Sequence, residues 1–271
     1  MVMRALLLPL LLLAPCAARA AQALVVISEP LTPSFREALD GFLAEWGEAV
    51  DTAPAGRALP PGPHGVIVAL GGHAAMRARR SGAPTVVALA PAYRDDDAGA
   101  ATVRVAMTPS PERFVSLLAA AGVRRLLAVR AAPPEPEFLR RAAEAGGKAG
   151  VAIEDRILSG PDGLPRLLRR DGVSADGVWL APDPASVTPE TFGAAREFSR
   201  ARSVPFFAPA AGLVMDEVRG ELTVSFRDCG REAARAAREL LAGRPVEKVV
   251  YPALAASSTT FVSPGGPASN R

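Results

Sequence analysis

From residue 23 onward the chain alternates short, mostly apolar segments with longer amphipathic ones. The apolar segments have the length of β-strands and lie at residues 23–28, 65–70, 85–89, 125–130, 151–156, 177–181 and 204–208. The amphipathic segments have the 3.6-residue period of α-helices and lie at residues 32–46, 72–80, 110–121, 135–146, 188–202 and 231–242. Because strands that are apolar on both faces must be covered on both faces, this alternation predicts parallel sheets flanked by helices.

Several predicted helices carry recognisable end signals. Thr32 precedes Pro33, and Ser110 precedes Pro111, which combines a capping side chain with a proline in the first turn. Glycine, which ends helices because it tolerates the left-handed conformation, follows three of the segments, at Gly122, Gly146 and Gly243.

The order of the units predicts two lobes rather than one sheet. A polar and small-residue stretch at residues 94–101 breaks the alternation, and we interpret it as a crossover between lobes, with a second crossover near Phe207. The predicted fold class is α/β, with two Rossmann-like lobes that have parallel sheets and are joined by crossover hinge segments. We assign 21–100 and 207–251 to the first lobe, 101–206 and 252–262 to the second, and 263–271 to a disordered tail.

The first 20 residues have the form of a secretory signal peptide. Arg4 precedes an apolar run at residues 5–14, and small residues at 17–20 lead to a cleavage position before Ala21. The run is too short to span a bilayer about 30 Å thick. We therefore expect export to the periplasm and exclude residues 1–20 from the fold.

The number of cysteines in the mature protein depends on how the leader is removed. A lipoprotein anchor at Cys16 is a competing interpretation, but Pro15 directly before that cysteine suits lipoprotein processing poorly. Removing Cys16 with the leader leaves Cys229 alone, so no intramolecular disulfide is expected and the core must supply the stability. No later apolar stretch approaches membrane-spanning length, so we expect no membrane insertion after the leader is removed.

The charge pattern argues against nucleic acid as a partner. The formal net charge is only +3, the arginines are scattered over predicted helices, and aromatic residues make up 5% of the chain. Single-strand binding needs a continuous basic groove with aromatic stacking platforms, and both are missing from the sequence.

Most signatures of catalysis are also missing from the sequence. The only histidines are His64 and His73, so an enzyme would need one of them to be oriented by a carboxylate in a cleft. Cys229 has no histidine near it in sequence and is best interpreted as a small buried thiol. The run at 95–97 is three aspartates, which fits a solvated turn better than a metal site. We expect no catalytic residue, no metal and no cofactor.

The candidate ligand contacts follow the carboxyl ends of predicted strands, where open α/β sheets bind ligands. Ser28 ends the first segment, and Gly71 and Gly72 follow the second, where glycine lets a ligand approach the backbone and the next helix offers free N–H groups to an anion. Tyr93 could stack on a solute, and Asp183 could pair with an amino group. The alternatives are a tight turn for the two glycines and simple turn capping for Tyr93 and Asp183.

The order and spacing of several short sequence segments resemble those of a known family. This family is the ABC-transporter substrate-binding proteins with the periplasmic-binding-protein-like type I fold, some of which bind amino acids. The resemblance extends over nearly all of the chain after the leader, and the similar segments lie at residues 25–28, 35–42, 66–75, 84–88, 177–183, 204–207 and 230–245. The last of these is the most specific, since its Gly-Arg-x-Ala-Ala helix ends in Leu-Ala-Gly-Arg-Pro. Two departures are the short segment between Gly47 and Pro63 and the absence of a further helix after Phe261.

The resemblance implies a function without chemistry. A monomer would capture a small polar organic ligand, with an amino-acid-like one favoured, between two closing lobes and present it to an ABC permease in the inner membrane. The alternative is an orphan periplasmic sensor or scaffold with the same fold and no transporter.

Overall fold

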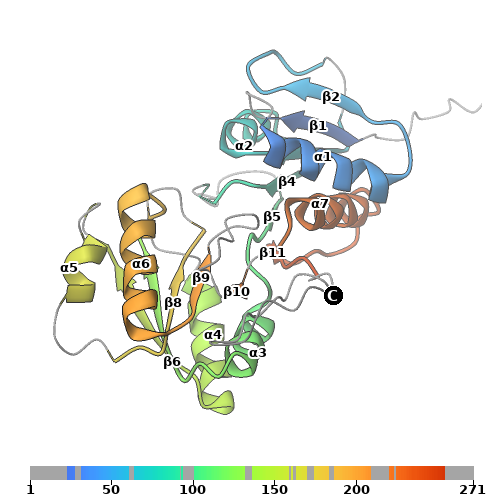
Figure 1. Cartoon of the computed structure of the whole chain (residues 1–271). Helices are drawn as coiled ribbons and strands as arrows, with labels where there is room; N and C mark the ends of the chain where they lie inside the picture. The colour runs from blue at the N-terminus through green and yellow to red at the C-terminus, as the bar shows by residue number, and fades with distance from the viewer. Residues whose placement is uncertain are drawn as a thin grey trace, which may run out of the picture.

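The structure is a computed structural model that describes residues 23–27, 32–60, 64–91, 93, 101–131, 136–158, 160, 163–169, 174–182, 186–208, 220–222 and 224–253. Its elements form two α/β lobes, the upper and the lower in Figure 1, and each lobe is built on one parallel sheet. The predicted fold class is therefore confirmed. The predicted signal peptide and the predicted tail lie outside the described residues.

The first lobe contains a six-stranded sheet. Its order is β11-β5-β4-β3-β1-β2, and every adjacent pair is parallel. The strands are β1 (Ala23–Ile27), β2 (Asp51–Pro54), β3 (Val66–Leu70), β4 (Thr85–Ala88), β5 (Thr102–Val105) and β11 (Val249–Val250). Every residue of the central strand β3 is buried, as expected for a strand covered on both faces.

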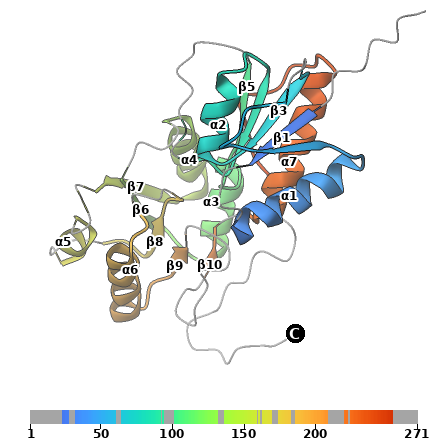
Figure 2. The ribbon, with the colours of Figure 1, turned by 90° about the horizontal axis from the view of Figure 1, so that it is seen from above.

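Helices cover both faces of this sheet, as Figure 2 shows from above. One face packs against α1 (Pro33–Trp46) and α7 (Phe226–Leu241), around Phe42 and Val68. The opposite face packs against α2 (Gly72–Arg79) through its buried alanines, Ala74, Ala75 and Ala78.

The second lobe contains a five-stranded parallel sheet in the order β10-β9-β8-β6-β7. Its strands are β6 (Arg125–Arg130), β7 (Ala152–Ile157), β8 (Gly177–Leu180), β9 (Phe206–Ala208) and β10 (Gly220–Glu221). One face packs around Phe114 and Trp179, and the other around Leu164 and Phe206. The helices on these faces are α3 (Pro111–Ala120) and α4 (Pro136–Ala149) on the first, and α5 (Gly163–Arg169) and α6 (Pro189–Arg202) on the second.

The helix ends agree with most of the signals in the sequence. The Ser110 hydroxyl accepts a hydrogen bond from the Arg113 N–H at 3.3 Å, which caps α3. Thr32 is the N-cap residue of α1, but its side chain makes no capping bond. Gly146 does not end a helix as predicted, because α4 continues to Ala149.

Gly146 is required for packing instead. A Cβ at Gly146 would lie 2.3 Å from the Val151 carbonyl oxygen, so glycine lets α4 approach the start of β7.

The lobe boundaries differ from the predicted ones at two strands. β5 lies in the first sheet although we assigned residue 101 onward to the second lobe, and β9 lies in the second sheet although we placed the return crossover near Phe207. The return crossover is later, because Leu222 packs in the core of the second lobe and Val224 in the core of the first. Among the described residues, no helix combines the length and apolarity needed to cross a membrane.

Candidate functional site

The carboxyl ends of the strands meet at one edge of each sheet because all described strand pairs are parallel. In the first lobe the turn after β3 shapes this edge. The Gly71 N–H donates to the Ala88 carbonyl at 2.8 Å, and the Gly71 carbonyl accepts from the Ala75 N–H at 2.9 Å. Gly71 therefore ties the end of β3 to the end of β4 and also begins α2.

Gly71 has a backbone conformation that other residues rarely adopt, with φ of 100° and ψ of 162°. The geometry of the turn is therefore sufficient to explain why residue 71 is a glycine. Gly72 differs from Gly71, because it is exposed and no described residue would lie within 4 Å of a Cβ built on it. The described part of the chain therefore leaves space beside Gly72.

The first turn of α2 is suited to an anion. Its N–H groups have no acceptor within the helix, and the helix dipole is positive at this end. The first turn contains no acidic residue that would neutralise this field, whereas Arg77 and Arg79 lie in the last turn. A carboxylate beside Gly72 would therefore approach the positive end of the helix dipole.

Tyr93 is positioned for packing. Its side chain is buried, with 8% exposed, in the cluster that joins α2 to the sheet and that includes Val26, Ala69 and Ala74. The ring is therefore part of the core under α2, and contact with a ligand stays a prediction.

Two of the five predicted contacts, Ser28 and Asp183, lie outside the described residues. Their positions in the chain still fix which strands they follow. Ile27 is the last residue of β1 and pairs with Leu70, directly before Gly71, so β1 and β3 end side by side. β8 ends at Leu180, in the middle of the second sheet. Both roles stay predictions.

Sequence reasoning missed an ion pair at the carboxyl edge of the second sheet. The Arg130 guanidinium at the end of β6 donates to both carboxylate oxygens of Asp155 on β7, at 2.7 Å from Nε and 2.5 Å from the terminal nitrogen. The Arg130 side chain is 11% exposed. The available signal was the arginine that directly follows the apolar run of this strand, which places a cation at the edge where ligand loops begin.

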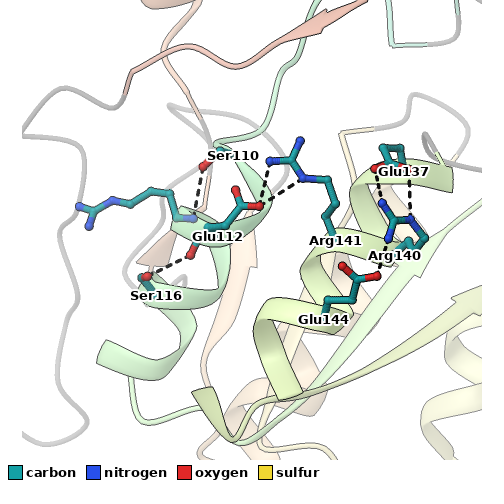
Figure 3. Close-up of polar contacts among 8 residues, drawn as sticks. Ser110, Glu112, Ser116, Glu137, Arg140, Arg141 and Glu144 are labelled. Atoms are coloured by element: carbon teal, nitrogen blue, oxygen red, sulfur yellow. Dashed lines mark hydrogen bonds and ion pairs between the residues drawn. The ribbon is translucent and has the colours of Figure 1, made fainter. Parts of the chain in front are cut away.

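A groove of about 460 Å³ lies between α3 and α4, on the outside of the second lobe. Figure 3 shows how the two arginines of the groove are paired: Arg141 donates to Glu112 at 2.8 Å, and Arg140 pairs with both Glu137 and Glu144. The acceptor oxygens of these guanidinium groups come from the protein itself. Both arginines of the groove are therefore already neutralised by carboxylates of the protein.

The described residues hold no arrangement typical of catalysis. The His64 ring contacts the Pro60 carbonyl oxygen at 3.0 Å, and His73 is exposed on α2. Cys229 is buried, and burial raises the pKa of its thiol to about 12. No cluster of three potential metal ligands occurs in the part of the chain that the structure describes, and the aspartates at 95–97 lie outside it.

No protein-family model matches this sequence, and no curated protein is significantly similar to it. Solved structures do match. The ABC domain from Streptococcus pneumoniae in complex with L-Trp has a TM-score of 0.57 at 13% identity, over 85% of this chain and 90% of that one. An open, ligand-free substrate-binding protein with adhesive properties from Clostridium difficile has a TM-score of 0.57 at 12% identity, over 85% and 89%.

A transcriptional regulator of the LacI family from Bifidobacterium animalis is also similar, with a TM-score of 0.51 at 13% identity over 91% of this chain and 100% of that one. These neighbours are solute-binding proteins and regulators built on one architecture. At such identities the likeness shows the fold, which is the type I periplasmic-binding-protein fold that the sequence resemblance implies.

Proposed function

We propose that this chain is an exported, non-enzymatic binding protein that captures a small polar organic solute between its two lobes and delivers it to an ABC-type importer. The observation that carries the proposal is the turn after β3, where the described residues leave space beside Gly72 at the positive end of α2. Affinity would come from closure of the lobes and exclusion of water.

An amino-acid-like ligand suits this edge best. Its carboxylate would bind at the start of α2, next to Gly72, and its amino group would pair with Asp183 from the second lobe. The complex of the Streptococcus pneumoniae neighbour with L-Trp supports this choice, since an amino acid is accommodated there by the same fold. The periplasm remains the proposed location, on the strength of the leader at residues 1–20.

The alternative is a sensor or scaffold without a transporter. It is favoured by the regulator among the neighbours and by the adhesive properties of the Clostridium difficile protein. Both functions use ligand or partner binding without chemistry, so the first question is whether a solute binds.

The proposal is tested by a thermal-shift screen against amino acids, small carboxylates, nucleosides and sugars, because a solute that binds only the folded state raises the melting temperature. The informative variant is Gly72→Asp. It adds a carboxylate in open space at the start of a helix, where acidic residues are tolerated, so the fold should persist while an anionic ligand is repelled.

The matched control is Gly193→Asp, which adds the same charge at an exposed glycine of α6 that also has no neighbour within 4 Å. We expect one solute class to stabilise the wild type and the control but not Gly72→Asp or Asp183→Ala. A stabilising solute that is unaffected by Gly72→Asp would contradict the assigned site, and no response to any class would favour the scaffold.

A further inference from the structure

Strand β7 lies at the edge of the second sheet. It is the last strand in its sheet order and, among the described residues, it pairs only with β6. Ala152, Glu154 and Arg156 are exposed. Their side chains share one face of the sheet, so the described helices do not cover β7 on that face. Ile157 is 59% exposed, the largest value among the exposed large hydrophobic side chains of the described residues.

The backbone of β7 presents hydrogen-bonding groups along this edge. The Ala152 N–H donates to Arg124 at 2.8 Å and the Leu158 N–H donates to Arg130 at 2.7 Å, so even-numbered residues face β6. The N–H and C=O groups of the odd-numbered residues, Ile153, Asp155 and Ile157, therefore point away from β6. Such a row is a template for another strand.

The side chains of β7 determine which strand can pair with this edge and in which register. A second copy of β7 aligned antiparallel, with the two-fold axis at Asp155, places Glu154 opposite Arg156 twice and Ile153 opposite Ile157 twice. Shifting the axis to residue 154 or 156 opposes two glutamates or two arginines. The strand is thus complementary to itself in one register.

Two local features fit this register. The Asp155 carboxylates would face each other, but each is already neutralised by the two hydrogen bonds from Arg130. The Asp155 carbonyl accepts only a 3.3 Å contact from the Arg156 side chain. Arg156 pairs with Glu154 of its own chain, and both side chains are about half exposed, so Arg156 can exchange this partner for Glu154 of a second copy.

We propose that β7 is a self-association edge, through which two copies of this chain pair antiparallel and join their second-lobe sheets into one continuous sheet. The contact is short, at six residues per copy, so association should depend on concentration. This proposal replaces the monomer expected from the sequence and does not depend on the proposed function.

Sedimentation velocity over a concentration series tests the proposal. We expect the wild-type sedimentation coefficient to rise with concentration. Glu154→Arg alone and Arg156→Glu alone should abolish the rise, because each places like charges opposite one another, and the double exchange should restore it. The sites are exposed, so circular dichroism should show an unchanged fold.

A matched pair of variants distinguishes association through this edge from non-specific association through exposed hydrophobic side chains. Ile157→Asp should abolish association, whereas Met76→Asp, at a 54% exposed position on α2, should not. A wild type that stays monomeric at every concentration overturns the proposal. So does association that survives the single charge reversals, or a double exchange that fails to restore it.

Discussion

The backbone of Gly230 on α7 lies directly against that of Ala38 on α1: a Cβ at Gly230 would be 1.9 Å from the Ala38 carbonyl oxygen. The contact is reciprocal, since a Cβ at Gly41 would be 2.1 Å from the Arg227 carbonyl oxygen. Two glycines thus let α1 and α7 meet closely on the sheet of the first lobe, although these helices are far apart in sequence.

Replacing Gly230 with alanine should therefore destabilise the first lobe. The added methyl group meets backbone, which cannot turn aside, so we expect the free energy of unfolding to fall by about 1–3 kcal/mol. The control is Gly193→Ala, an exposed helical glycine with open space, where the free energy should rise by about 0.5–1 kcal/mol. Urea denaturation measures both, and equal effects would rule out the close helix contact.

The ion pair between Glu45 and Arg235 should make stability depend on pH. The hydrogen bond from the Arg235 side chain lowers the pKa of Glu45 below its ordinary value of 4.5. A lowered pKa means that the stabilising contribution is complete above the unfolded-state value and disappears as pH falls through the folded-state value.

We therefore expect wild type to exceed Glu45→Gln in stability by a constant amount above about pH 5.5, with the difference shrinking in more acidic solution. Denaturation at a series of pH values measures this difference. A gap that widens on acidification would contradict the assignment of Glu45 as the titrating group.

Cys229 should be unreactive in the folded protein. Burial raises the pKa of its thiol to about 12, so very little reactive thiolate exists near pH 8. We expect an aromatic disulfide reagent to label Cys229 rapidly in denaturant and slowly without it. Fast labelling of the native protein would show that α7 does not stay packed on its sheet.

The ion pair between Arg130 and Asp155 should contribute more to the free energy of unfolding than an ion pair on the surface. Asp155→Ala removes two carboxylate oxygens that accept from Arg130, a side chain that is only 11% exposed, and we expect a loss of about 1–3 kcal/mol. Glu137→Ala is the control, because Glu137 and Arg140 are both more than half exposed and such pairs contribute about 0–1 kcal/mol. Losses of the same size in urea denaturation would contradict this ranking.

The sequence predicted the parallel sheets and the two lobes because buried strands such as β3 are apolar throughout. It misplaced β5 because Thr102–Val105 is short and alternates half-buried polar residues with buried valines, so it lacks the continuous apolar run of β3. The turn at Gly71 was recognisable from local sequence alone. The packing of Tyr93 and the contact between Arg130 and Asp155 depend on which elements become neighbours, and chain order does not show that.

Capture by closure requires a solute to be held by both lobes at once, and small-angle X-ray scattering with and without the solute identified in the thermal-shift screen measures whether the lobes close. We expect the radius of gyration to decrease when the solute saturates the protein and to return to its starting value after dialysis. An unchanged radius of gyration at saturation would place the solute on one lobe and contradict capture by closure.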